Sequence, residues 1–323
     1  MSSFAARAAA IAAVALLLLL FVLVNVTAGK GRPASAAPGR DTGQSMVYKG
    51  LKRTYLLHTP TGHDLNRTWP LVFVLHGGGG SGAKVARLTG FSRLADSTGI
   101  IVVYPDAVNH HWNDGRKVRH FRSQRENVDD VGLVSALIDR LVKDLNADPQ
   151  QVYVTGISNG GMMCHRLACE MSDKIAAIAP VAAALPEPLA DSCNPARPVS
   201  VLAINGTEDP LVSYQGGGVG LVGQRGRVLS VRETIEHWVK ADACSAVPDT
   251  ARLPDLDPLD GITVVRETHG SGKQGIEVIL YRVEGGGHTW PSGAERIRKF
   301  GPTARDIDAT RLIWEFFSRH PRQ

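Results

Sequence analysis

Cysteine is scarce in this sequence, and its spacing excludes one common use. The chain of 323 residues has four cysteines and no Cys-x-x-Cys pair, which argues against a zinc site built from paired thiolates. In an exported protein cysteines form disulfides instead. Cys169 and Cys193 flank the same apolar run at residues 175–181, and we expect these two to pair.

A large excess of one charge is also missing. The formal net charge is +5, and Arg7, Lys30 and Arg32 account for +3 of it, with no acidic residue before residue 37. The remaining net charge of +2 is too small to indicate binding to a nucleic acid, so we expect no nucleic-acid partner. With 43% hydrophobic and 21% charged residues, the composition is that of a folded globular protein rather than a disordered one.

One long apolar run stands at the N-terminus. Residues 8–24 are rich in Leu and Ala, and the sequence ASA at residues 34–36 offers a small-residue cleavage site. We therefore expect residues 1–36 to be the signal peptide of a secreted or cell-envelope protein. The alternative is an uncleaved membrane anchor, because the run is about long enough to span a bilayer. Residues 37–45 are then expected to be a linker, and residues 46–320 a single folded domain.

Short apolar runs alternate with helical patterns through the rest of the chain, without an internal repeat. Near-continuous apolar strands separated by helices predict a mostly parallel sheet covered on both faces, in one doubly wound α/β domain. In the helical pattern 130–145, Asp129 or Asp130 can cap the N-terminus. The apolar runs are residues 53–58, 71–75, 100–104, 152–155, 175–181, 199–205 and 276–283.

A glycine-rich loop follows the second of these runs, in the sequence VFVLHGGGGSG at residues 72–82. Gly77, Gly79 and Gly82 satisfy G-x-G-x-x-G, which in a dinucleotide-binding unit cradles phosphates. The same loop can instead present backbone N–H groups to a reacting carbonyl. The choice depends on the chemistry found elsewhere in the chain.

The sequence VYVTGISNGGMM contains a G-x-S-x-G pattern around Ser158, between an apolar run and a helical one. This placement is typical of the nucleophile elbow of the α/β-hydrolase fold, in which a strained turn exposes the serine. Serine needs a base and an orienting acid, which follow it in the order acid, then histidine. Asp209 and His288 come after later apolar runs in that order, with Glu208 as the alternative acid.

With this assignment the glycine loop has a role. In this fold the oxyanion hole consists of the N–H after the nucleophile and an N–H from the loop after the third strand. We expect Asn159 and Gly78 to supply them, and His76 to be a structural hydrogen-bonding residue. The dinucleotide hypothesis loses support, because it leaves Ser158, Asp209 and His288 without a role.

At these residues the sequence resembles the secreted polyhydroxybutyrate depolymerase and feruloyl esterase family of α/β-hydrolases. The resemblance extends over residues 55–317, and its motifs are LHGGGGSG, WNDGR, DDVGLV, GISNGGMM, NGTEDPLVSY and EGGGHTWPSG. It implies an α/β-hydrolase catalytic domain at 46–320 and a triad of Ser158, Asp209 and His288. It implies neither a metal nor an organic cofactor.

Two departures from the family limit what the resemblance implies. Members often carry a second cysteine before the last strand to pair with the position of Cys244, and here that segment is THGSGKQG. Members that attack insoluble polyester usually append a polymer-binding module, whereas this chain stops soon after its last helical pattern. We therefore expect an unpaired Cys244 and a soluble or short-chain ester substrate.

Trp112 and Trp290 are the candidate aromatic residues of the substrate pocket. Trp112 follows an apolar run and Trp290 follows His288 by two positions, and both are expected at the carboxyl edge of the sheet where ligands bind. Packing without substrate contact is the alternative for each. The adjacent His110 and His111 point different ways and do not indicate a metal site.

The sequence thus predicts an exported serine carboxylesterase that works through an acyl-enzyme on polyhydroxybutyrate-oligomer, feruloyl or short-chain acyl esters. Two rival functions remain, a serine peptidase of the same fold and a non-catalytic cell-envelope binding protein on a hydrolase scaffold. The glycine-rich segment 216–227 is expected to be a mobile rim of the pocket.

Overall fold

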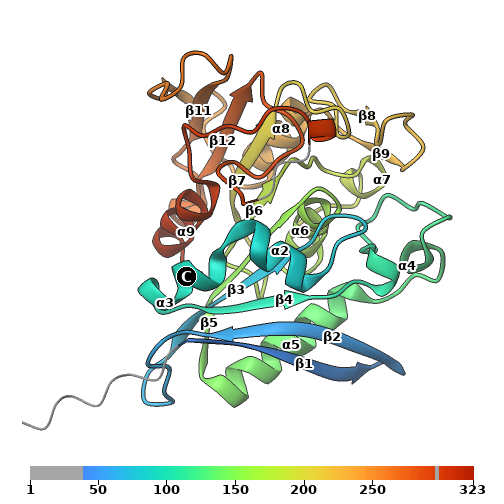
Figure 1. The fold of residues 1–323 in the computed structure, drawn as a ribbon, viewed down its shortest axis with the longest axis vertical. Helices are drawn as coiled ribbons and strands as arrows, with labels where there is room; N and C mark the ends of the chain where they lie inside the picture. The colour runs from blue at the N-terminus through green and yellow to red at the C-terminus, as the bar shows by residue number, and fades with distance from the viewer. Residues whose placement is uncertain (1–38, 295–297) are drawn as a thin grey trace, which may run out of the picture. The chain divides into compact units, whose positions relative to one another are not determined.

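A ten-stranded sheet forms the centre of the protein in the computed structural model, which describes residues 39–294 and 298–323 (Figure 1). The strand order is β1-β2-β4-β3-β5-β6-β7-β12-β11-β10. Strands β4 to β12 in this order run parallel, and antiparallel strands extend the sheet on both sides. The ten strands are β1 (Arg40–Tyr48), β2 (Leu51–Thr59), β3 (Trp69–Leu75), β4 (Ile101–Pro105), β5 (Ala147–Ile157), β6 (Ala177–Val181), β7 (Ser200–Gly206), β10 (Asp249–Arg252), β11 (Thr263–His269) and β12 (Val278–Glu284).

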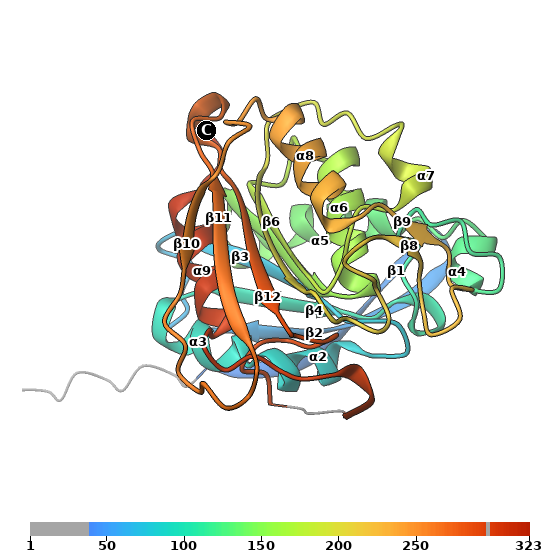
Figure 2. The same cartoon turned by 90° about the horizontal axis from the view of Figure 1, so that it is seen from above.

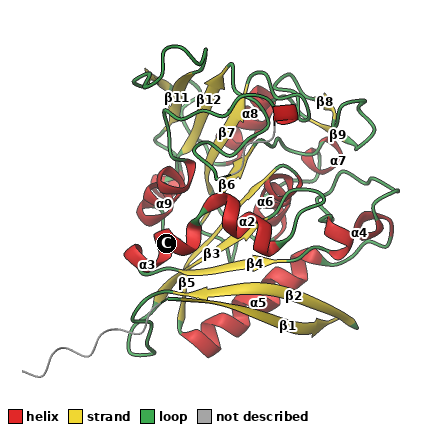
Figure 3. Cartoon of the chain, viewed as in Figure 1, coloured by secondary structure: helices red, strands yellow, loops and turns green. Residues whose placement is uncertain are grey.

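Helices cover both faces of the sheet (Figures 2 and 3). Leu71 and Phe73 of β3 share one core with α5, α6 and α8, whereas Val72 and Val74 pack on the other face with α2, α3 and α9. Because both faces are buried, the central strands are apolar throughout, and the predicted mostly parallel α/β-hydrolase domain is confirmed. The helices are α2 (Gly82–Thr89), α3 (Phe91–Thr98), α4 (Arg122–Arg125), α5 (Asp130–Leu145), α6 (Asn159–Glu170), α7 (Glu187–Ala190), α8 (Val231–Ala241) and α9 (Ala309–Arg319), with 3-10 turns η1 (Val108–His110), η2 (Lys273–Gly275) and η3 (Arg298–Phe300).

The expected linker at residues 37–45 requires a correction, because Arg40–Tyr48 form β1. In β1 half-buried side chains alternate with exposed ones, as in a strand that packs on one face only. The expected signal peptide at residues 1–36 lies outside the described residues. Within the described ranges no helix has both the length and the apolar character needed to cross a membrane.

The two candidate caps of α5 have different roles. Asp129 accepts a hydrogen bond from the Gly132 N–H and caps the helix. Asp130 is fully buried and forms an ion pair with Arg53, with Nη2 and Oδ1 2.7 Å apart. Burial raises the pKa of Asp130, and the Arg53 guanidinium counteracts that rise. The Asp130 side chain therefore links α5 to β2 through its ion pair and does not cap the helix.

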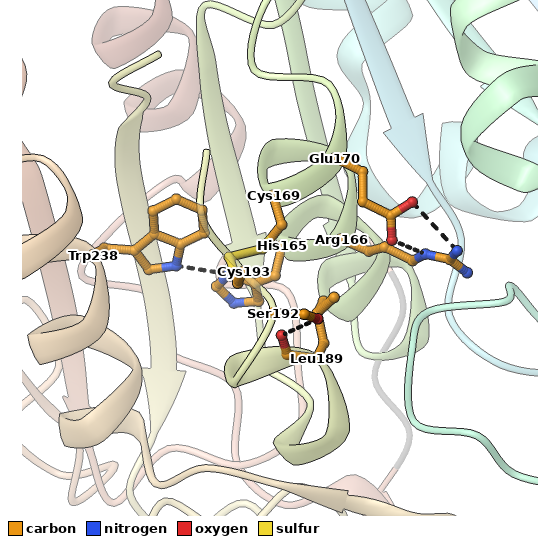
Figure 4. The surroundings of a disulfide bond; sticks show 8 residues. All are labelled: His165, Arg166, Cys169, Glu170, Leu189, Ser192, Cys193 and Trp238. Atoms are coloured by element: carbon orange, nitrogen blue, oxygen red, sulfur yellow. Dashed lines mark hydrogen bonds and ion pairs between the residues drawn. A yellow bond between two sulfur atoms is a disulfide. The ribbon is translucent and has the colours of Figure 1, made fainter. Parts of the chain in front are cut away.

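A disulfide joins Cys169 at the end of α6 to Cys193 after α7, which confirms the expected pair (Figure 4). Beside it, the Trp238 Nε1–H donates to His165 Nδ1 over 3.1 Å, and burial lowers the pKa of His165 to about 3. The disulfide thus links the two ends of the segment that contains β6, and it lies next to His165, which is neutral and fully buried. Cys244 carries a free thiol, as the departure from the family implied.

Asp242 is a buried carboxyl group that should make stability depend on pH. Its Oδ1 accepts from the Val199 N–H at 3.0 Å, whereas Oδ2 has no partner among the described residues. Burial raises the pKa of Asp242 from 3.8 to about 7. The folded state therefore holds a proton that the unfolded state releases near pH 4, and the stability this group contributes below pH 4 is lost as the pH rises through 7.

We expect Asp242→Asn to raise the free energy of unfolding by roughly 3 kcal/mol at pH 8 and to change it little at pH 4. The asparagine amide has the shape of the protonated acid and carries no charge, while its oxygen can still accept from the Val199 N–H. Urea unfolding of both proteins at the two pH values measures the difference. An equal difference at pH 4 and pH 8 would contradict the assigned protonation.

Candidate active site

Ser158 stands on a strained turn between β5 and α6. Its φ is 58° and its ψ is −122°, a conformation that costs free energy for a residue other than glycine. The two glycines of the pattern permit the turn, because a Cβ at Gly160 would lie 2.3 Å from the Leu75 carbonyl oxygen and one at Gly156 would lie 2.7 Å from it. The Ser158 side chain makes no capping hydrogen bond to α6. Its hydroxyl is therefore available for other chemistry.

Asp209 and His288 meet at the carboxyl end of two neighbouring strands. β7 and β12 pair in parallel, and the loops that follow them place His288 Nδ1 2.7 Å from Asp209 Oδ2. The other oxygen of Asp209 accepts the N–H groups of Leu211 and Val212 at 2.8 Å each. Both partners of the pair are buried. Since the carboxylate accepts at Nδ1, the proton of a neutral imidazole lies there, and Nε2 is left as a base.

Glu208 does not compete for this position. Its side chain is exposed, and its backbone N–H donates to the Gly286 carbonyl oxygen over 2.9 Å. Glu208 is therefore exposed to solvent, whereas Asp209 is buried and contacts the imidazole.

Ser158 and His288 line one cavity of about 970 Å³ together with the glycine loop. In that loop the Gly79 N–H donates to the His110 carbonyl and the Gly80 N–H donates to the Gly77 carbonyl. No acceptor for the Gly78 N–H occurs among the described residues. The N–H of Asn159 opens α6 and has no partner within that helix. Gly78 and Asn159, whose N–H groups are expected to form an oxyanion hole, thus border the same cavity as Ser158.

His76 is a structural residue of the glycine loop and carries no charge. Its Nε2 accepts from the Ala107 N–H at 3.1 Å, and Nδ1 is 2.8 Å from the Gly77 carbonyl oxygen. An acceptor at Nε2 fixes the proton on Nδ1, which then donates to Gly77. Burial lowers the pKa of His76 to about 4. Both ring nitrogens are used in shaping the loop, and neither is free for proton transfer.

A buried polar network that sequence reasoning missed holds the side chain of Asn159. Its Nδ2 donates to Asp114 Oδ2 at 2.5 Å, and its Oδ1 accepts from the Trp112 N–H at 2.8 Å. Asp114 is fully buried and also pairs with Arg116 at 2.7 Å. Gln124 Nε2 donates to the second oxygen of Asp114 at 2.9 Å. The polar residues inside the WNDGR motif were the available signal for this network.

The expected substrate role of Trp112 is wrong. The side chain is fully buried, its Nε1–H donates to the His76 carbonyl at 2.9 Å, and it does not line the cavity. Trp290 does border the cavity, but it is only 1% exposed and its Nε1–H donates to Thr310. Other aromatic side chains that line the cavity include Phe300 and the pair His111 and Phe121, which are stacked with ring centroids 3.9 Å apart.

His110 and His111 are not arranged as metal ligands. His110 Nδ1 lies 2.8 Å from the Gly80 carbonyl oxygen, and His111 Nδ1 lies 3.0 Å from the Asn109 carbonyl oxygen. In the part of the chain that the structure describes, no three His, Cys, Asp or Glu side chains gather as metal ligands would.

Comparison with known proteins places this chain in a family. Residues 53–186 match the model of the family described as Esterase PHB depolymerase. The putative esterase NocK of Nocardia uniformis subsp. tsuyamanensis is 34% identical over 290 residues, which cover 87% of this chain and 83% of that protein. Feruloyl esterase B of Piromyces equi is 27% identical over 248 residues, covering 75% of this chain and 43% of that protein.

Among solved structures, the acetyl xylan esterase from Aspergillus awamori is similar with a TM-score of 0.55 at 16% sequence identity. The match covers 86% of this chain and 99% of that one. At this identity the likeness concerns the fold alone.

Proposed function

We propose that Ser158, His288 and Asp209 form the catalytic triad of this protein. The chain belongs to the polyhydroxybutyrate depolymerase esterase family and is a carboxylic ester hydrolase. The observation that carries the proposal is the buried hydrogen bond between His288 and Asp209 at the cavity that Ser158 borders. We further propose that the protein is exported by a signal peptide at residues 1–36. Its substrates are polyhydroxybutyrate oligomers, feruloyl esters or short-chain acyl esters.

The proposed reaction starts from a neutral His288 imidazole, which carries its proton on Nδ1 and can accept another at Nε2. Ser158 Oγ bonds to the ester carbonyl carbon while its proton passes to His288 Nε2, and Asp209 stabilises the imidazolium that forms. The N–H groups of Gly78 and Asn159 donate to the oxyanion. His288 then gives the proton to the departing alcohol oxygen, which leaves an acyl-enzyme. Water attacks this ester with His288 as base, the acid departs, and the proton returns to Ser158.

A panel of esters tests this function. We expect the purified protein to hydrolyse 4-nitrophenyl acetate and butyrate, methyl ferulate or a soluble 3-hydroxybutyrate oligomer, and to lose that activity after labelling by a fluorophosphonate, which reacts only with an activated serine. A peptidase would cleave peptide anilides in preference to esters. A binding protein would neither hydrolyse the panel nor take up the label, and that result would overturn the proposal.

Asn159 should matter through its side chain as well as its N–H. We expect Asn159→Ala to lower kcat by about 10- to 100-fold while KM changes less than about threefold. The alanine keeps the backbone donor but loses the contacts to Asp114 and Trp112 that fix its direction, and small displacements of a positioned group are costly for rate.

The matched control is Asn113→Ala. Asn113 is an equally buried amide of the same motif, and its Nδ2 donates to Asn127 and to the Val128 carbonyl, away from the elbow. The Asn113→Ala substitution should lower the free energy of unfolding and leave kcat of the folded protein unchanged. Equal kcat values for the wild type and Asn159→Ala would show that the network has only a structural role.

A further inference from the structure

The Lys, Arg, Asp and Glu side chains that line the active-site cavity within the described ranges are all positively charged. Five basic side chains border it, and no aspartate or glutamate does so within the described ranges; the basic residues are Lys84, Arg87, Arg116, Arg225 and Lys299. A cavity lined by charges of one sign concentrates the field and attracts ligands of the opposite sign. The triad needs no such field, because a neutral ester carries no charge to attract.

Four of these cations have no carboxylate partner among the described residues. Arg116 pairs with the buried Asp114, whereas Lys84, Arg87, Arg225 and Lys299 are exposed and enter none of the ion pairs of the structure. Some other exposed basic residues do pair, as Arg140 with Asp144 and Arg311 with Glu315, whereas others in the described ranges, such as Lys143 and Lys240, do not, so it is the gathering of the four at one cavity that sets them apart. We call the four residues the cationic rim.

The cationic rim draws on three separate segments around the catalytic residues. Lys84 and Arg87 are three residues apart on α2 and therefore share a face of that helix. Lys299 lies beside Phe300, whose carbonyl accepts the His288 N–H at 2.6 Å. Arg225 belongs to the loop between β8 (Gly217–Gly218) and β9 (Arg227–Val228). The cationic rim therefore comes from three separate segments of the chain that border one cavity.

The field reaches into the cavity. The pKa of His111, which stacks on Phe121 in the cavity wall, is lowered first by burial and further by the charges of Arg116 and Arg225, while the Asn109 carbonyl and Asp114 oppose this. Of the four residues of the cationic rim, Arg225 thus acts on a side chain in the cavity wall.

Apolar side chains accompany the cations on the same rim. Leu221 and Val222 lie in the β8–β9 loop, border the cavity, and are 74% and 76% exposed. Large aliphatic side chains with this exposure cost free energy in water unless a ligand covers them. The combination suits a molecule that has both an aliphatic chain and a negative end.

We propose that this cavity selects esters that carry a free carboxylate on an aliphatic chain, with the cationic rim binding the carboxylate and the apolar loop residues covering the chain. This rests on the proposed function, because the carboxylate is recognised while Ser158 attacks the ester. Exposed ion pairs are individually weak, so the selectivity comes from several of them together. It amounts to about tenfold in kcat/KM at low ionic strength.

Two matched substrate pairs test the proposal on the whole protein. The first is mono-4-nitrophenyl adipate against the uncharged 4-nitrophenyl 6-oxoheptanoate, with the carboxylate on the acyl chain. The second is 6-(butyryloxy)hexanoate against the uncharged 6-oxoheptyl butyrate, with the carboxylate on the alcohol chain and butyrate release as the readout for both esters of this pair. We expect the charged member to be preferred about tenfold at 20 mM NaCl in at least one pair. At 1 M NaCl the preference should fall below about twofold, because the Debye length is then about 3 Å.

The variant Lys84→Gln/Arg87→Gln should reduce the preference about threefold or more. Its control is Lys143→Gln/Lys240→Gln, which removes the same charge from exposed positions on α5 and α8 and should keep the preference. Equal hydrolysis of charged and uncharged esters would overturn the inference and leave the esterase function standing. Failure to hydrolyse any of them would overturn both.

Discussion

Replacing Ser158 by alanine is expected to lower kcat toward ester substrates by about 10³- to 10⁶-fold, with unchanged folding. The loss is that large because the acyl-enzyme route needs the Oγ atom, while the oxyanion donors and the cavity alone accelerate hydrolysis only modestly. Initial rates with 4-nitrophenyl butyrate give the ratio, and fluorophosphonate labelling should disappear together with turnover. Retained hydrolysis and labelling in the alanine variant would contradict the assignment of the nucleophile.

A second variant separates chemistry from strain at this position. Ser158 has a φ of 58°, which alanine tolerates about as poorly as serine and glycine adopts readily. We expect Ser158→Gly to be as inactive as Ser158→Ala but more stable, by up to about 1 kcal/mol. If the glycine variant kept activity, the hydroxyl would not be the nucleophile.

The centre of the fold could be predicted because burial on both faces leaves a strong pattern. Each predicted apolar run overlaps a strand, from residues 53–58, which lie within β2, to residues 276–283, which overlap β12. The edge strand β1 was not predicted, because only one of its faces packs and its composition is therefore that of a polar linker. Strand β10, with one half-buried residue among its four, was missed for the same reason.

The candidate site divides along a similar line. Ser158, Asp209 and His288 have recognisable surroundings and a fixed order in the chain, and the residues that orient them do not. That Trp112 turns inward while His111 faces the cavity depends on backbone direction at one residue, which no periodicity records. The link from Asn159 to Asp114 crosses 45 residues of sequence and joins the first residue of α6 to a loop. Such contacts become visible only once the sheet brings these segments together.

The substitution Asp209→Asn should lower kcat by about 10⁴-fold while leaving the protein folded. Asp209 Oδ1 accepts two backbone N–H groups, so an asparagine oxygen takes that place and its NH₂ group faces His288. The imidazole must then accept at Nδ1 and carry its proton on Nε2, where Ser158 needs a base. Kinetics on 4-nitrophenyl butyrate, with Glu208→Gln as the neighbouring control, measure the effect. Because Glu208 is exposed to solvent, its substitution should change kcat less than about twofold, and a larger loss there than at Asp209 would reverse the choice of acid.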